Sequence, residues 1–163
     1  MARANLNVSQ QLQTEFQKAQ EPSSKIRAIK AVINEEEISF SSTLSIVRTA
    51  EHDFDALVLS ILKETEAAMV LFRLGDDAKD KTKKWLLIAW IPDGCKVRDK
   101  MLYSSSREDL KRNLGLGLFG PDYAASAPSE ITWEGYVAST QVNSNLYISR
   151  MFYLHIIDTD AFQ

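Results

Sequence analysis

Cysteine is almost absent from this 163-residue chain, because Cys95 is the only one. A single cysteine cannot form a disulfide within the chain, so a reducing, cytoplasmic compartment fits the sequence best. The first residues, Met1 to Asn5, lead into polar sequence and lack the apolar core of a signal peptide. Apolar runs also stay well short of the roughly 20 residues that span a bilayer. We therefore expect a cytoplasmic protein that does not cross a membrane.

Histidine is scarce too, and His52 and His155 show no metal-ligand spacing with Cys95. A net charge of −3 gives no global bias toward nucleic acid. No group of residues has the pattern of a catalytic site. The stretch Gly115-Leu-Gly-Leu-Phe-Gly120 matches the dinucleotide fingerprint in letters, but it follows a predicted helix instead of a strand, so we interpret it as a helix end and loop. The sequence predicts no metal, no cofactor and no enzymatic activity.

Hydrophobic periodicity predicts a single domain with alternating helices and strands. Helices are expected over Val8–Ala19, Asp53–Leu62, Lys96–Asn113 and Thr132–Thr140. Strands are expected over Ile26–Ile33, Glu37–Ile46, Ala67–Leu74 and Trp85–Ile91, with room for one more short strand between Leu116 and Ala127. The strand from Trp85 is apolar on both faces, which is typical of a central strand covered by helices on both sides. The fold class is therefore α/β, with a central mixed sheet of about five strands sandwiched between helices.

The long helix Lys96–Asn113 has an unusual distribution of apolar side chains. With about 100° of rotation per residue, Leu102, Ser106 and Leu110 share one side and should face the sheet. Val97 and Met101 project from nearly the opposite side, beside Arg98 and Arg112. Lys96, Lys100, Arg107 and Lys111 form a basic row along one edge. Two interpretations stay open: an ordinary solvated helix face, or an interface with a protein partner, because interface centres favour Met and Arg.

Three stretches carry a resemblance to a known family. They are Met69-Val-Leu-Phe-Arg-Leu-Gly75, then Trp85-Leu-Leu-Ile-Ala-Trp-Ile-Pro-Asp-Gly94, then Val97-Arg-Asp-Lys-Met-Leu-Tyr-Ser-Ser-Ser-Arg107. A strand ending in Trp-x-Pro-Asp, followed by a helix with Val-[Lys/Arg]-x-Lys-Met-x-Tyr, resembles the actin-depolymerising-factor homology (ADF/cofilin) family, whose fold is gelsolin-like. Within that family, residues 71–103 are most similar to the N-terminal domain of the twinfilins.

The resemblance implies binding to actin monomers, preferably ADP-bound, with the long helix entering a cleft between two actin subdomains. Such binding would sequester monomers and inhibit nucleotide exchange and filament assembly. Arg98, Lys100 and Met101 match the actin-contacting positions of the family. The expected actin-binding surface is Lys96, Val97, Arg98, Lys100, Met101, Arg107, Lys111 and Arg112. Phosphoinositides are implied as competing ligands of this basic surface, and the actin cytoskeleton as its location.

An alternative within the family is a cofilin-like protein that binds filament sides and severs them. That activity uses a second basic surface, on the charged loop and the last helix; the loop has Lys79, Lys81, Lys83 and Lys84, whereas Thr132–Thr140 has no Lys or Arg. A peripheral lipid-binding protein is a third hypothesis, weakened by the net negative charge. We expect an ADF-homology domain over 1–141 and a tail of unknown role over 142–163. Since twinfilins carry two such domains, the chain would be a fragment or a single-domain relative.

Overall fold

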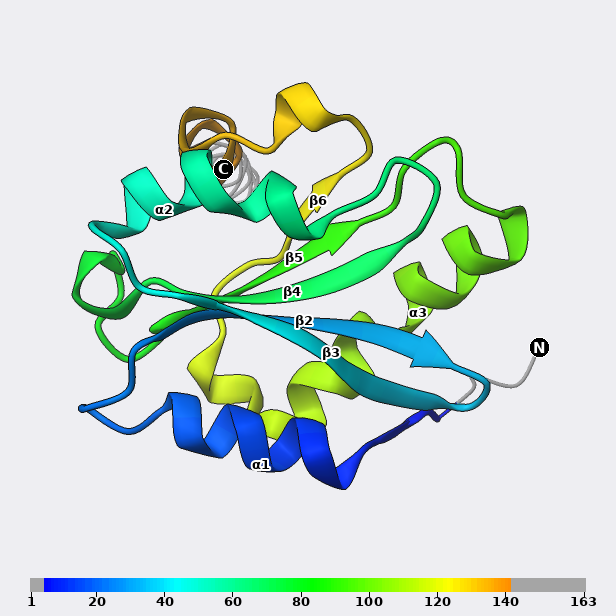
Figure 1. Cartoon of the computed structure of the whole chain (residues 1–163), viewed down its shortest axis with the longest axis horizontal. Coiled ribbons are helices and arrows are strands. Elements are labelled where there is room, and N and C mark those ends of the chain that lie inside the picture. The colour runs from blue at the N-terminus through cyan, green and yellow to red at the C-terminus, as the bar shows by residue number, and fades with distance from the viewer. Residues whose placement is uncertain (1–4, 142–163) are drawn as a thin grey trace, which may run out of the picture.

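The computed structural model describes residues 5–141, which form one mixed sheet with helices on both faces (Figure 1). The strands are β1 (Asn7–Val8), β2 (Ile26–Asn34), β3 (Glu37–Ser45), β4 (Ala68–Arg73), β5 (Trp85–Trp90) and β6 (Tyr123–Ala125). The helices are α1 (Gln10–Ala19), α2 (Ala50–Leu57) and α3 (Val97–Leu114), with 3-10 turns η1 (Val58–Ile61), η2 (Gly75–Asp77), η3 (Leu116–Leu118) and η4 (Pro128–Glu130). Residues 133–141 are also helical.

The sheet has the strand order β1-β3-β2-β4-β5-β6. Its four central strands pair antiparallel, while the short edge strands β1 and β6 pair parallel with β3 and β5. The predicted fold class is thus confirmed, with six strands where about five were expected. The predicted tail, 142–163, lies outside the described residues, and the domain boundary near 141 stays a prediction.

Two hydrophobic cores lie on the two faces of the sheet. Phe16 of α1 and Leu110 of α3 pack with Leu87 on one face. Phe54 of α2 packs with Ile88 on the other, and Figure 1 shows α2 on the opposite side of the sheet from α1 and α3. Every residue of β5 is buried because neighbouring side chains alternate between the two cores. The prediction of a central, two-sided strand is therefore confirmed.

The start of the chain differs from the prediction of a helix from Val8. Val8 belongs to β1, where it pairs with Ile38 of β3 and is buried. The helix begins after Ser9, whose side-chain oxygen accepts a hydrogen bond from the backbone N–H of Leu12 at 3.1 Å. Val8 shares the helical spacing of Leu12 and Phe16, so periodicity alone included it in the helix. The N-cap bond of Ser9 fixes the true boundary.

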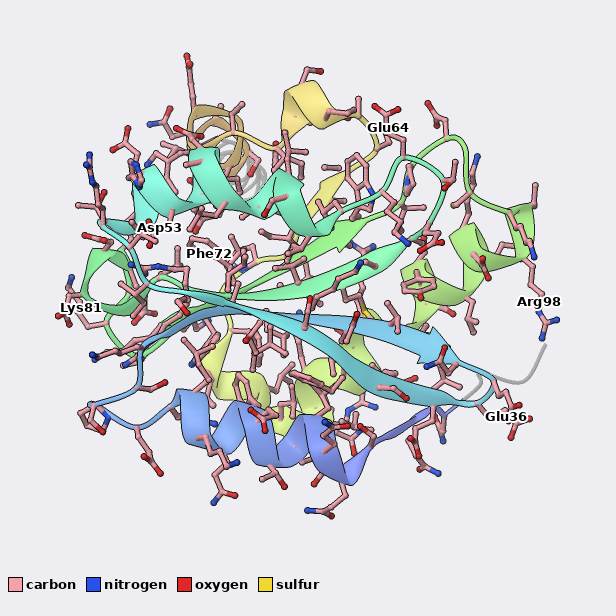
Figure 2. The ribbon with its side chains drawn as sticks, in the orientation of Figure 1. Glu36, Asp53, Glu64, Phe72, Lys81 and Arg98 are labelled. Atoms are coloured by element: carbon pink, nitrogen blue, oxygen red, sulfur yellow. The ribbon has the colours of Figure 1, made fainter. Side chains whose placement is uncertain are left out.

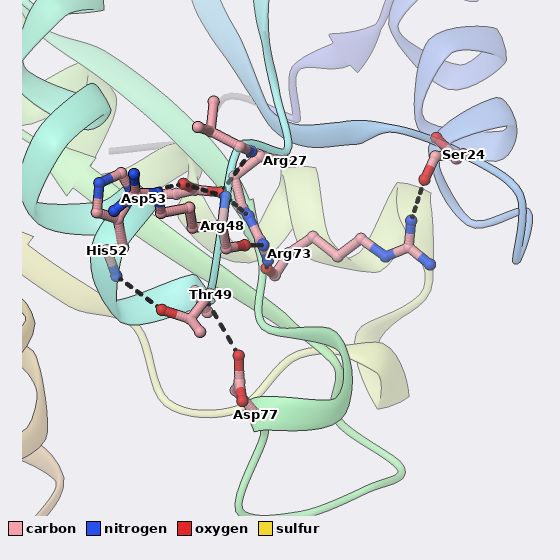
Figure 3. Close-up of polar contacts among 10 residues, drawn as sticks. Ser24, Arg27, Arg48, Thr49, His52, Asp53, Arg73 and Asp77 are labelled. Carbon is pink, nitrogen blue, oxygen red and sulfur yellow. Dashed lines mark hydrogen bonds and ion pairs between the residues drawn. The ribbon is translucent and has the colours of Figure 1, made fainter.

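A buried ion pair fixes the start of α2 against β2 (Figure 3). Arg27 Nε lies 2.9 Å from Asp53 Oδ2, and the remaining guanidinium nitrogens donate to the backbone oxygens of Arg73 and Arg48. Asp53 also accepts the backbone N–H groups of Val47 and Arg48, both at 3.0 Å. Burial raises the pKa of Asp53, but the hydrogen bonds outweigh burial and hold this pKa below 3.8. Both charges are therefore satisfied inside the fold.

Candidate functional site

Helix α3 begins at the same end of the molecule as the turn between β2 and β3 (Figure 1). Its buried side holds Tyr103, Ser106 and Leu110, while Leu102 and Leu114 pack at the edge of the core. The hydroxyl oxygen of Tyr103 accepts a hydrogen bond from the backbone N–H of Ile33 at 2.8 Å, which ties α3 to β2. Burial is the main cause of the raised pKa of this phenol. The predicted sheet-facing stripe is confirmed.

The opposite side of α3 carries two large apolar side chains in solvent. Val97 is 72% exposed and Met101 is 61% exposed, and they lie one turn apart on the same face. The same face continues with exposed Ser105 and Glu108. Single exposed apolar side chains are common, but Val97 and Met101 together form a small apolar surface at the start of one helix. Its exposure, expected from the helical periodicity, is confirmed.

Positive charge surrounds this apolar pair. Arg98 projects from the end of the molecule in Figure 2, and Lys96 and Arg98 are exposed while Lys100 is half-buried. Across residues 5–141, no carboxylate lies within ion-pairing distance of these three cations. Their charge is therefore available to a partner.

The positive charges of these three side chains lie at the end of α3 where they destabilise the helix. The N-terminal end of a helix has a partial positive charge, so cations there are unfavourable and acidic side chains are preferred. Lys96 occupies the N-cap position without a side-chain cap bond, and Asp99 is the single acid of the first turn. Locally unfavourable residues of this kind concentrate at functional sites. The charges at the start of α3 thus run against the preference of a helix N-terminus.

The remaining predicted site residues are placed differently. Lys111 is largely buried and its Nζ lies 2.8 Å from Asp122 Oδ1, while Arg107 Nη1 lies 4.0 Å from Asp122 Oδ2. Arg112 pairs with Glu108 at 3.4 Å within the helix. The basic row is therefore split: its C-terminal half is neutralised, and its N-terminal half is not. Asp122 was not anticipated, since it lies in an irregular segment after η3.

The second basic region lies in the connection between β4 and β5. Figure 2 shows Lys81 at the end of the molecule opposite Arg98. The connection Gly75–Lys84 has four lysines against three aspartates, a net charge of +1. The side-chain amine of Lys81 donates to the backbone oxygen of Asp76, and Lys84 lies 3.9 Å from the Asp76 carboxylate. By formal charge, the three aspartates of the connection thus offset three of its four lysines.

The last described helix presents no cations. Residues 133–141 contain no Lys or Arg, and Glu134 is exposed. Thr132 Oγ1 accepts the backbone N–H of Gly135 at 3.0 Å, as expected for a capping residue. The groove between this helix and α2 has the exposed acids Glu51, Asp55 and Glu134 along it.

Within residues 5–141 there is no helix long and apolar enough to cross a membrane. The same part of the chain has no group of three or more His, Cys, Asp or Glu residues arranged for a metal ion. Residues 115–120 leave α3 through η3 and lead to β6 without opening a helix. Gly115, at φ 123°, ends α3 in a conformation that favours glycine, which supports the reading of this stretch as a helix end.

Sequence comparison places these features among known proteins. A family model described as cofilin/tropomyosin-type actin-binding protein matches residues 5–140. Twinfilin of Drosophila pseudoobscura pseudoobscura is 38% identical over 113 residues, covering 69% of this chain and 32% of that protein. Twinfilin of Drosophila melanogaster is 34% identical over 132 residues, covering 80% of this chain and 37% of that protein. The chain thus spans about a third of the length of these relatives.

Solved structures show the same fold. The structure of Eh twinfilin aligns with a TM-score of 0.72 at 33% identity, covering 83% of this chain and 98% of the other. The cofilin of Streptomyces griseoflavus aligns with a TM-score of 0.63 at 22% identity, covering 82% of this chain and 95% of the other, a likeness of fold alone. The resemblance seen in the sequence, including the similarity to twinfilins, is therefore confirmed.

Proposed function

The chain belongs to the family of cofilin/tropomyosin-type actin-binding proteins, and on that basis we propose that it binds actin monomers through the start of α3. The observation that supports this most directly is the exposed pair Val97 and Met101 beside three unpaired cations. Such a surface suits an apolar cleft with an acidic rim. Actin would be the partner, in the cytoplasm and its cytoskeleton, and the protein would not be an enzyme.

In this proposal Met101 is the central anchor. A flexible, polarisable thioether adapts to an apolar cleft, and Val97 extends the contact by one turn. Arg98 and Lys100 flank the anchor, and Lys96 adds charge at the helix start. Arg107 and Arg112 would contribute at the margin, because each already has an acidic neighbour. Lys111 would contribute to the fold through its ion pair with Asp122, and little to the interface.

The consequence of this mode would be monomer sequestration. Binding of the helix between two actin subdomains would slow nucleotide exchange and block addition of the monomer to filaments. ADP-bound monomers would be preferred, as the family resemblance implies. Phosphoinositides would compete for the same cations, since phosphate groups and an acidic cleft rim require the same positive charge.

Filament binding is the second candidate, and the exposed lysines between β4 and β5 are the observation that favours it. The offsetting aspartates and the absence of cations from residues 133–141 weigh against it. Exposed lysine pairs also contribute little at physiological salt. We therefore favour binding to actin monomers over binding to filaments.

The test is a titration of dye-labelled actin monomers with the whole chain and with Arg98→Ala/Lys100→Ala. Truncating a charged residue at an interface centre costs about 2 kcal/mol or more, so loss of both should cost about 4 kcal/mol and the double variant should bind roughly 700-fold more weakly if the two effects add. Lys79→Ala/Lys83→Ala is the matched control and should bind like the unaltered chain. Unchanged affinity in the α3 variant would remove this helix from the interface. Strong cosedimentation with filaments, lost in the Lys79/Lys83 control, would establish the second candidate instead.

A further inference from the structure

A groove of about 790 Å³ lies between the helical segment formed by α2 with η1 and the helical residues 133–141. Its lining is mostly apolar and includes Leu59, Pro128, Ile131, Trp133, Val137 and Ala138. Leu59 is 39% exposed, and Ala138 is exposed as well. Within residues 5–141 this apolar lining is thus left open to solvent.

Two rows of helical side chains form the walls of the groove. Glu51, Asp55 and Leu59 recur every fourth residue and therefore share one side of α2 and η1. Trp133 and Val137 have the same spacing on the other wall. The carboxylate of Asp55 accepts the backbone N–H of Trp133 at 2.7 Å, which holds the two walls together. A groove bounded by two helices in this way suits a third, amphipathic helix.

The polar part of the lining is acidic. Glu51, Asp55 and Glu134 are exposed along the groove, and the lining contains no Lys, Arg or His. In the described part of the chain, these three carboxylates form no ion pair with a cation. An apolar centre with a polar, charged rim is the usual arrangement of a protein interface. The occupant that fits is therefore a helix with apolar side chains surrounded by positive charge.

The start of α3 is such a helix. Its exposed Val97 and Met101 match the apolar lining, and its cations Lys96, Arg98 and Lys100 match the three acids of the rim in number and opposite sign. Figure 1 shows α2 on one side of the sheet and α3 on the other. A chain therefore cannot place its own α3 in its own groove. The two surfaces can meet only between separate copies of the chain.

We propose that the start of α3 of one copy docks into the groove of a second copy. Met101 would contact the apolar lining beside Leu59, and Arg98 would lie against the acidic rim. The two surfaces differ, so the contact is head-to-tail and leaves one groove and one helix free for further copies. A contact limited to one helix end is small, which is typical of weak and transient association. Because opposite charges attract across it, association should weaken as salt concentration rises.

Self-association of this kind would occupy the same side chains that we assign to actin. A copy whose α3 is docked in a neighbour has no free helix for another partner, so association would hold part of the protein in a reserve. Dilution would release it. The inference uses the start of α3, but it does not require that actin is the partner of this helix.

The experiment is sedimentation velocity of the whole chain over a range of concentrations, with two complementary variants. Arg98→Gln/Met101→Gln removes the helix surface, and Glu51→Gln/Glu134→Gln removes the groove surface. Each variant alone should associate at least about tenfold more weakly than the unaltered chain, a loss of one favourable contact or more. A mixture of the two retains one intact groove and one intact helix. It should therefore form a one-to-one dimer that cannot grow further.

Controls separate this contact from general effects of charge. Glu21→Gln/Glu64→Gln removes the same charge from exposed positions outside the groove and should associate like the unaltered chain. Leu59→Ala keeps the charge and removes part of the apolar lining, so it should also weaken association. This variant keeps the test valid if the acidic double variant fails to fold.

Three results would overturn the proposal. The unaltered chain could remain monomeric at high concentration and low salt, which would leave the groove to a basic segment of another protein or to residues 142–163. The mixture of complementary variants could fail to form a dimer, or the control could lose association as much as the groove variants. Actin titrations of dilute groove variants should match the unaltered chain. Failure of actin binding can thus be distinguished from failure of self-association.

Discussion

The sharpest test of the α3 surface is a substitution that should strengthen the fold and weaken the interface. Lys96 holds the N-cap position with φ −63° and ψ 144°, and its backbone oxygen accepts from the N–H of Lys100 at 3.1 Å. This backbone already has the extended conformation of a capped helix start. Only a side-chain acceptor is missing. Lys96→Asp supplies that acceptor and reverses the charge at the positive end of the helix.

The expected gain follows from these two effects. A capping side chain contributes about 1 kcal/mol, within a range of about 0.5–2 kcal/mol. A favourable charge at the helix end adds about 0.3–1 kcal/mol at low salt. The free energy of unfolding should therefore rise by roughly 1–2 kcal/mol, and the melting temperature should rise by about 2–4 °C for each kcal/mol in a domain of this size. Lys96→Ser, which caps without adding a charge, should give about half of this gain.

The same substitution should reduce the affinity for actin monomers, because it removes one of three unpaired cations and adds an anion. Thermal and chemical denaturation measure the first effect, and a monomer titration measures the second. The comparison variant is Lys18→Asp, at the opposite, C-terminal end of α1, where Lys is favourable; it should lower stability and leave actin binding unchanged. If Lys96→Asp fails to stabilise the protein, the argument about the helix start is wrong. If it stabilises the protein without weakening binding, the interface lies elsewhere.

Two further predictions concern the fold. Ile88→Ala should lower the free energy of unfolding by about 2–5 kcal/mol, because Ile88 is fully buried in β5; denaturant titration measures this, and a loss below about 1 kcal/mol would contradict the packing described. Asp53 has its pKa depressed in the folded state, so its stabilising contribution is complete above the pKa of an unfolded aspartate and is lost as pH falls through the lower, folded value. Unfolding free energies measured from pH 5 to pH 2 should therefore fall less steeply in Asp53→Asn, and an unchanged slope would refute the assignment.

Much of the fold could be predicted from local pattern. The apolar run of β5 and the stripe through Leu102 and Leu110 identified a two-sided strand and the buried side of α3. Features that depend on distant residues were missed. Strand β1 has two residues and exists through its pairing with β3. Helix α2 begins at Ala50, three residues before the prediction, because Thr49 caps it and Ala50 N–H donates to Asp77 Oδ2.

The candidate surface was likewise predicted where it depends on local pattern and missed where it depends on distant residues. Helical periodicity was sufficient to predict that Val97 and Met101 are exposed, because the angle of a residue around the helix axis determines whether it faces the sheet or solvent. It could not show that Lys111 is largely buried against Asp122, since that contact joins α3 to an irregular segment. Burial of Asp109 on the same helix was missed as well. The sequence of a helix therefore shows on which side each cation lies. Contacts with distant residues decide which of these cations remain without an acidic partner.

The bond between Tyr103 and Ile33 has a kinetic consequence. It joins α3 to the sheet two residues after Met101, so the start of the helix is held in a fixed orientation before any partner binds. A surface that is already ordered loses little conformational entropy on association. Encounter with an acidic cleft would then be governed by diffusion and by long-range attraction, both sensitive to ionic strength. Differences among variants of the apolar anchor would appear in the lifetime of the complex, while variants of the flanking cations would alter how quickly it forms.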